Sequence, residues 1–338
     1  MSIAYQRFVI DELPKGPLEE RHFRLEEGVL PALEAGQVAV RVILISQDAA
    51  NRAWLQGATY RGAVQTGDVM PSGAIAEVLA SEDPGFAPGE LVYGDIGWQS
   101  HAIMPGAALR KVGPHRPLTH HLSLLGVAGK TAYHGLFQAA GIHAGETLLV
   151  SAAAGSVGSL VGQLGKLKGA RVIGVAGGPE KCAWVRDTLG FDECLDYRDE
   201  SRPLPKALAA VAPGGVDVYF DNTGGPILQA ALFAMREQGR IACCGAVSMY
   251  DGAPRPGPVG VPGLIVVKRL TLKGFIVSDY AHLDADAEHE LALWAKQGQL
   301  HMEEDILEGL EAAPRGLIGL LAGQNRGKRM VRLAPDPA

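Results

Sequence analysis

A strand, a loop of small residues and a helix follow one another over residues 147–168, and this segment constrains the fold more than any other. Its loop, residues 151–158, reads Ser-Ala-Ala-Ala-Gly-Ser-Val-Gly. Gly155 and Gly158 occupy the second and third glycine positions of a dinucleotide-binding fingerprint, and Ala152 occupies the first. Small side chains let the backbone approach a pyrophosphate, whose charge then meets the unpaired N–H groups of a helix N-terminus. The pattern predicts that a dinucleotide cofactor contacts Ala154, Gly155, Ser156, Val157 and Gly158.

Strand-like and helix-like segments alternate after about Leu124, which predicts βαβ crossovers and a parallel sheet. The residues before about 110 contain short strand-like segments separated by turn signals, which predicts a compact, mostly β unit. In the first part we expect strands at 37–46, 73–80, 90–93 and 102–104. In the second part we expect strands at 147–152, 171–176, 216–221, 239–245 and 270–277, and helices at 156–168, 179–189, 204–211, 227–235 and 286–296, before a last strand within 327–333.

Composition excludes several classes of protein. A length of 338 residues with 47% hydrophobic residues suits about two globular domains. The net charge of −6 offers no source of affinity for nucleic acid. Asp11 and Glu12 interrupt any signal peptide, and glycines break the charge-free run 147–165, so we expect neither secretion nor a membrane span. The four cysteines form no CxxC pair, which favours reduced thiols in the cytoplasm.

The second predicted strand indicates which dinucleotide is bound. An NAD site usually has Asp or Glu at the end of this strand, but residues 175–178 read Val-Ala-Gly-Gly. Lys181 follows in the first turn of the next predicted helix, where it can meet an adenosine 2′-phosphate. The alternative is a solvated lysine, since Glu180 stands beside it. We therefore predict NADP(H) as the cofactor.

Five segments together resemble one family: 150–169, 174–182, 216–225, 268–280 and 319–328. They are similar to the zinc-independent medium-chain dehydrogenase/reductases, in the branch of prostaglandin, alkenal double-bond and curcumin reductases. The resemblance runs from about Val38 to Arg332. It implies a GroES-like catalytic domain over residues 1–125, completed by 301–338, and a Rossmann NADP-binding domain over 126–300.

The same resemblance implies roles for individual residues. Lys181 and Tyr197 would hold the 2′-phosphate, and Tyr250 would donate a hydrogen bond to the substrate carbonyl. The alternative for Tyr250 is a loop tyrosine that only packs. The other residues that the resemblance places along the cofactor are Gly177, Asn222, Gly245, Phe275, Ile276, Val277 and Asn325.

One departure from the family concerns the substrate pocket. Where the family reads Asp-Pro-Tyr-Met-Arg, residues 48–52 read Asp-Ala-Ala-Asn-Arg. The pocket is then wider or differently shaped, with Asn51 and Tyr60 at its edge. Trp54 and a loop over 251–262 are further candidates, and this loop is equally well read as a lid or as a plain connector.

Other chemistries lack their residues. We find no ligand set for catalytic or structural zinc, and we interpret His120 and His121 as a surface pair. Residues 126–131 end like a Walker A loop, but Leu124 stands where its first glycine belongs. The sequence also contains no G-x-S-x-G motif of a hydrolase.

These observations lead to one prediction of function and two alternatives that stay open. We expect an NADPH-dependent reductase that transfers a hydride to the β-carbon of α,β-unsaturated ketones or aldehydes. A quinone reductase of the same superfamily, and a non-catalytic NADPH-binding regulatory or structural protein, remain alternatives. A homodimer is expected from the family alone.

Overall fold

The computed structural model describes residues 3–251 and 257–337 and divides the chain into two compact units. Unit 1 comprises Met1–Leu122, Tyr250–Gly252 and Glu304–Ala338, and unit 2 comprises Ser123–Met249 and Ala253–Glu303. Of the loop expected over 251–262, residues 252–256 lie outside the described residues.

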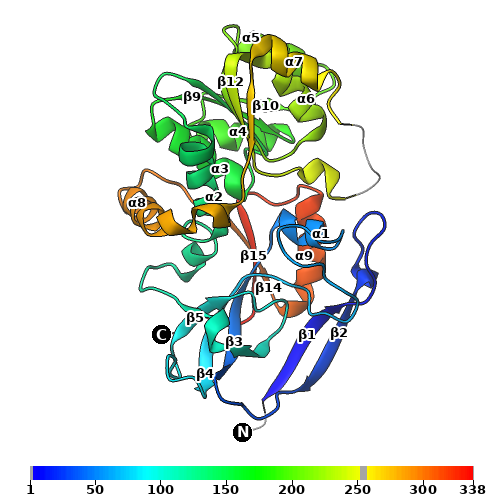
Figure 1. The fold of residues 1–338 in the computed structure, drawn as a ribbon, viewed down its shortest axis with the longest axis vertical. Helices are drawn as coiled ribbons and strands as arrows, with labels where there is room; N and C mark the ends of the chain where they lie inside the picture. The colour runs from blue at the N-terminus through cyan, green and yellow to red at the C-terminus, as the bar shows by residue number, and fades with distance from the viewer. Residues whose placement is uncertain (1–2, 252–256, 338) are drawn as a thin grey trace. The chain divides into compact units, whose positions relative to one another are not determined.

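Unit 2 is built on a six-stranded sheet whose neighbouring strands all run parallel. The strand order is β10-β9-β8-β11-β12-β13, so the first strand in sequence is central and the chain winds outward in both directions. This doubly wound α/β arrangement is the predicted fold class (Figure 1). The strands are β8 (Thr147–Ser151), β9 (Arg171–Ala176), β10 (Glu193–Asp196), β11 (Val216–Asp221), β12 (Met235–Cys243) and β13 (Thr271–Gly274).

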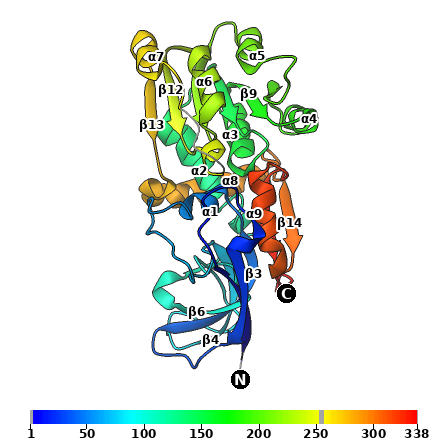
Figure 2. The same ribbon diagram turned by 90° about the vertical axis from the view of Figure 1, so that its right-hand side faces the viewer.

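Helices cover both faces of this sheet because consecutive strand residues alternate between two apolar cores. On β8, Leu148 and Val150 pack into one core and Leu149 packs into the other. The first core takes side chains from α2 (Val127–His134), α3 (Ser156–Leu167), α4 (Pro179–Asp187) and α8 (Asp284–Lys296). The second takes side chains from α5 (Leu204–Val211), α6 (Gly225–Ala234) and α7 (Val261–Lys268), and Figure 2 shows α3 and α6 flanking the sheet.

Unit 1 contains a seven-stranded sheet and a separate hairpin. The sheet order is β14-β15-β3-β4-β5-β7, and β6 pairs with β3. The C-terminal strand β15 pairs antiparallel with β3, so the end of the chain completes a sheet begun near its start. The strands are β1 (Ala4–Ile10), β2 (Phe23–Val29), β3 (Gln37–Ser46), β4 (Ala74–Ser81), β5 (Leu91–Gly94), β6 (His101–Pro105), β7 (Arg110–Lys111), β14 (Glu304–Glu308) and β15 (Lys328–Arg332), with the helices α1 (Ala49–Trp54) and α9 (Ala313–Leu321).

The structure adds elements that sequence periodicity did not predict. The hairpin β1–β2, the six-residue helix α1 and the four-residue strand β10 are too short or too polar to show a clear period. The strand expected over 270–277 is limited to Thr271–Gly274, since the residues from Val277 onward form a 3₁₀ helix. No helix among the described residues combines the length and apolar character needed to cross a membrane.

Candidate functional site

The carboxyl ends of the six parallel strands bring the predicted cofactor residues of unit 2 to one edge of the sheet. Parallel strands all end at the same edge, and ligands of open α/β sheets bind beside it. The strand order β10-β9-β8-β11-β12-β13 also gives the order in which the predicted cofactor residues follow one another along this edge. The residues after the respective strand ends are Tyr197, Gly177 and Lys181, Ala154 to Gly158, Asn222, Gly245, and Phe275 to Val277.

The loop after β8 is tightly folded against the helix that follows it. A Cβ atom on Gly158 would lie 2.3 Å from the carbonyl oxygen of Ala152, so no larger residue fits without moving the loop. Ala152 has a φ of 49°, in the region that favours glycine, and this explains why the fingerprint has glycine at this position. On the same helix, a Cβ atom on Gly162 would overlap the Phe191 ring. The missing side chains thus let α3 approach both its own loop and the Phe191 ring.

The start of α3 fits a phosphate group. Gly155 is the N-cap residue and has no side chain to cap the first turn, so backbone N–H groups remain there for a ligand. Ser156, the first helical residue, has a buried Oγ with no hydrogen-bond partner among the described residues. A buried hydroxyl without a partner is uncommon, and a pyrophosphate oxygen would satisfy it.

The ends of β9 and β10 form the predicted 2′-phosphate region. Gly177 has neighbours so close that a Cβ atom would lie 3.0 Å from Cε1 of Tyr197 and 2.9 Å from Nε of Arg198. Tyr197 is 46% exposed, and Lys181 lies in the first turn of α4. Arg198 was not among the sequence-predicted residues. The sequence signal that could have identified it is its position directly after Tyr197, a residue already expected at the 2′-phosphate.

Asn222 is oriented by the two central strands. Its backbone N–H donates to Ser151 Oγ at 2.9 Å, and its side-chain Nδ2 donates to the Ser151 carbonyl oxygen at 2.8 Å. Asp221, which is 2% exposed, accepts hydrogen bonds from the Tyr219 hydroxyl at 2.7 Å and from the N–H of Gly224 at 2.8 Å. Burial raises the pKa of the Tyr219 phenol, which therefore stays protonated as the donor.

The outer strand ends are held to this centre. The N–H of Gly245 donates to the carbonyl oxygen of Asp221 at 3.1 Å. The Phe275 ring meets the Phe220 ring edge to face at 6.0 Å, and a Cβ atom on Gly135 would lie 2.4 Å from Phe275. Ile276 and Val277 begin the 3₁₀ helix Val277–Leu283.

Tyr250 belongs to unit 1, where its neighbour Asp251 is held by a buried arginine. Arg52 is 2% exposed, and its Nε donates to Asp251 Oδ1 at 3.0 Å while its Nη2 donates to the Gly16 carbonyl oxygen at 2.8 Å. Gln56 Nε2 also donates to the Tyr250 carbonyl oxygen at 2.8 Å. Two side chains that start on or beside α1 therefore hold the backbone that directly follows the Tyr250 side chain.

Three further predicted residues also lie in unit 1. Asn51 is 1% exposed; its Nδ2 donates to the Pro71 carbonyl oxygen and its Oδ1 accepts from the N–H of Asp48, so both ends of its amide act within the fold. Tyr60 is 60% exposed and its hydroxyl accepts from Trp54 Nε1 at 3.1 Å. Asn325 donates to the Gly327 carbonyl oxygen at 2.9 Å.

The histidines interpreted as a surface pair are half-buried and belong to a cluster with His115. The rings of His115 and His120 stack at 5.1 Å, and His121 lies edge-on to His115 at 5.9 Å. Burial lowers the pKa of His120 to about 4. Among the residues that the structure describes, no group of three or more His, Cys, Asp or Glu is arranged to hold a metal ion.

Lys130, in the segment that resembles a Walker loop, is held by acidic residues of α8. Its Nζ lies 2.7 Å from Asp284 Oδ2 and 2.6 Å from Glu288 Oε1. The side chain is 9% exposed, so its charge is already neutralised inside unit 2. This pairing explains the lysine without a nucleoside triphosphate.

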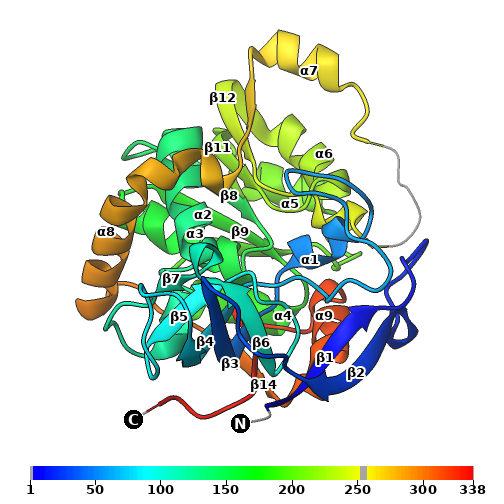
Figure 3. The same ribbon diagram turned by 60° about the horizontal axis from the view of Figure 1, so that its bottom comes forward.

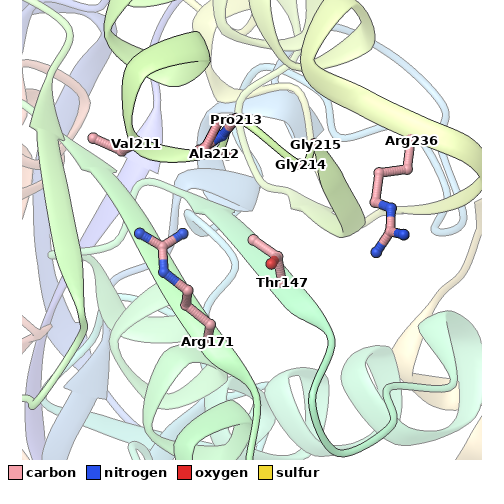
Figure 4. A pocket seen from close by; sticks show the side chains of 8 residues that line it. All are labelled: Thr147, Arg171, Val211, Ala212, Pro213, Gly214, Gly215 and Arg236. Atoms are coloured by element: carbon pink, nitrogen blue, oxygen red, sulfur yellow. The ribbon is translucent and has the colours of Figure 1, made fainter.

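A cavity of about 530 Å³ lies at the opposite edge of the parallel sheet (Figure 4). Thr147 and Arg171, which begin β8 and β9, line it together with the 211–215 loop and Arg236. Since the predicted cofactor residues follow the carboxyl ends of the strands, this cavity is not the predicted cofactor site.

Comparisons with known proteins agree with this arrangement. The family described as N-terminal domain of oxidoreductase matches residues 6–112, and the family described as zinc-binding dehydrogenase matches residues 156–294. The NADPH-dependent curcumin reductase of Escherichia coli is 40% identical over 98% of this chain and 97% of its own length. The NADP(+)-dependent 2-alkenal reductase of Nicotiana tabacum is 39% identical over 82% of this chain and 81% of its own. The crystal structure of CurA in complex with NADPH from Vibrio vulnificus has a TM-score of 0.92 at 35% identity, over 98% of this chain and 100% of that chain.

Proposed function

Because the chain belongs to the zinc-independent medium-chain dehydrogenase/reductases, in the branch of curcumin, prostaglandin and alkenal reductases, we propose that it reduces the carbon–carbon double bond of α,β-unsaturated ketones or aldehydes. The chain is an NADPH-dependent oxidoreductase. The observation that carries the proposal lies at the carboxyl ends of the parallel strands. There the glycine loop leaves N–H groups at the start of α3, the buried Ser156 hydroxyl has no partner among the described residues, and Gly177 has no side chain, as a phosphorylated dinucleotide requires.

The residues of unit 2 have distinct proposed roles toward the cofactor. The turn over Ala154, Gly155, Ser156, Val157 and Gly158 binds the pyrophosphate through N–H groups and the Ser156 hydroxyl. Lys181 and Tyr197, beside Gly177, hold the 2′-phosphate. Asn222, Gly245 and the 275–277 backbone lie toward the nicotinamide. Asn325 remains a proposed cofactor residue from the family resemblance alone. When bound, NADPH supplies the hydride for the β-carbon of the substrate.

The proposed role of Tyr250 is to stabilise charge on the substrate. Addition of a hydride to the β-carbon of an enone moves negative charge to the carbonyl oxygen, and a donor aimed at this oxygen lowers the barrier. The Tyr250 phenol is such a donor, and the Arg52–Asp251 pair and Gln56 hold its backbone. Asn51 and Tyr60 stay proposed pocket residues, with Tyr60 the exposed member of the two.

The experiment follows loss of NADPH absorbance with a panel of enones, enals and quinones and identifies the products by NMR. We expect saturated ketones and aldehydes in which the carbonyl group is retained. Turnover of quinones without turnover of enones would refute the substrate assignment. Binding of NADPH without oxidation by any acceptor would instead support a non-catalytic protein.

A variant pair tests the proposed donor. Tyr250→Phe should lower kcat by about 100-fold, since it removes one hydrogen bond to the developing oxyanion, and leave the affinity for NADPH unchanged. Tyr5→Phe, which removes a phenol from β1, is the control. Unchanged kcat in Tyr250→Phe would remove this residue from the mechanism.

We also propose that two copies associate through β13, the last strand of the parallel sheet. Within the described part of the chain this strand pairs only with β12, so its other edge has backbone groups without a ladder partner there. Nearby, Phe233, Val266 and Val267 are 60%, 73% and 69% exposed, and Figure 3 shows α7 at the outer margin of unit 2.

The four cysteines are free thiols, which supports the cytoplasm as the proposed location.

A further inference from the structure

We propose that Arg198 is a second cationic ligand of the adenosine 2′-phosphate and the residue that most strongly makes the site discriminate NADPH from NADH. This inference rests on the proposed location of the 2′-phosphate at the ends of β9 and β10. It concerns a residue that the family resemblance did not assign.

Arg198 lies beside the end of β9. An added Cβ atom on Gly177 would lie 2.9 Å from Nε of Arg198, so the guanidinium lies over the residue that follows β9. In NAD-dependent proteins of this fold, an acidic residue at the end of this strand binds the ribose 2′-hydroxyl. Here that position has no side chain, and a cation occupies the adjacent space. A 2′-phosphate bound here would therefore meet the Arg198 cation and would not be repelled by a carboxylate.

The contacts of Arg198 hold its guanidinium in place. Its Nε donates to the Tyr197 hydroxyl at 3.3 Å, and its central carbon lies 5.5 Å from the centre of the Tyr197 ring. The backbone N–H of Arg198 donates to Asp196 Oδ1 at 2.9 Å, and the N–H of Gly178 donates to the same oxygen at 2.8 Å. Asp196 therefore ties the loop that carries Arg198 to the turn that starts α4.

Lys181 supplies a single positive charge from the first turn of α4, whereas a 2′-phosphate is dianionic. Arg198 forms no ion pair within residues 3–251 and 257–337, and its charge is available to a ligand. A guanidinium also offers a planar fork of N–H donors that matches two oxygens of one phosphate.

The experiment titrates the purified protein with NADP⁺ and with NAD⁺ by calorimetry. Arg198→Gln should weaken binding of NADP⁺ by about 10- to 100-fold, as expected for loss of charge-assisted hydrogen bonds, and leave binding of NAD⁺ unchanged. Unchanged NAD⁺ binding also shows that the variant is folded. Arg198→Lys, which keeps the charge and loses the fork, should have an intermediate loss.

The control is Arg202→Gln, which removes an exposed cation four residues further along the same loop and should change neither affinity. If Arg198→Gln binds NADP⁺ as the unmodified protein does, or loses both ligands equally, the inference about Arg198 is wrong while the NADPH assignment stands. If the unmodified protein itself shows no preference for NADP⁺, the proposed 2′-phosphate site fails together with the inference.

Discussion

Replacement of Arg52 by Met should destabilise unit 1 and slow turnover at the same time. The Arg52 guanidinium binds Asp251 at 3.0 Å and the Gly16 carbonyl oxygen at 2.8 Å, and Asp251 Oδ1 also accepts the N–H of Leu18 at 2.8 Å. One buried side chain thus joins α1 to residues 16–18 and to the segment that carries Tyr250. Methionine fills much of the volume but leaves a carboxylate and a carbonyl oxygen without this partner.

The magnitude follows from the burial of the two partners. Loss of one member of a buried ion pair costs about 3–5 kcal/mol. The Asp251 side chain is 27% exposed and gains water when Arg52 is removed, so we expect a value near the lower limit, about 3 kcal/mol. Arg52→Lys keeps the charge without the fork and should lose less, about 1–2 kcal/mol. The free energy of unfolding is measured by urea titration.

A double-mutant cycle separates positioning from general destabilisation. Arg52→Met and Asp251→Asn should each lower kcat more than they raise KM, and the double variant should lose much less than the sum of the two. The exposed pair Arg315–Glu20, with side chains 77% and 55% exposed, is the control, and Arg315→Met should cost less than about 1 kcal/mol. Additive losses, or unchanged kcat in a destabilised Arg52→Met, would refute the positioning role.

Three other predictions concern the loop, the histidines and the assembly. Gly158→Ala should weaken NADPH binding at least about tenfold in a titration, because its Cβ atom would displace Ala152, whereas Gly263→Ala, with open space around it, should not. The His120 pKa is lowered by burial to about 4, so below pH 6.5 the unfolded chain takes up a proton that the folded chain does not. Stability should therefore fall between pH 6.5 and 4, and the urea midpoint of His120→Asn should depend less on pH; an unchanged slope would contradict this. Val267→Asp should give a monomer in size-exclusion chromatography with light scattering, and an unchanged dimer would exclude the β13 edge.

The sequence by itself determined those strands, turns and helix starts that depend on interactions between residues close together in the chain. Apolar strands, a glycine loop and a helix start can be read within about 20 residues, because backbone conformation, capping and burial of a strand depend on near neighbours. The doubly wound α/β class followed from their alternation, and it is confirmed. NADP(H) was predicted from a missing carboxylate at 175–178 and the lysine at 181, and it is supported by the relatives.

Only the tertiary structure decided which distant residues meet. Arg52 and Asp251 are 199 positions apart in the sequence, and no hydrophobic periodicity or motif predicts that they pair. Arg198 gains its place from the missing side chain of Gly177, and His120 gains its depressed pKa from burial beside His115. Contacts of this kind depend on strand order and loop packing, which are set by the whole core and not by neighbouring residues. The sequence therefore predicted a dinucleotide site after the strands of unit 2, while the partners of its other polar side chains could be identified only from the assembled sheets.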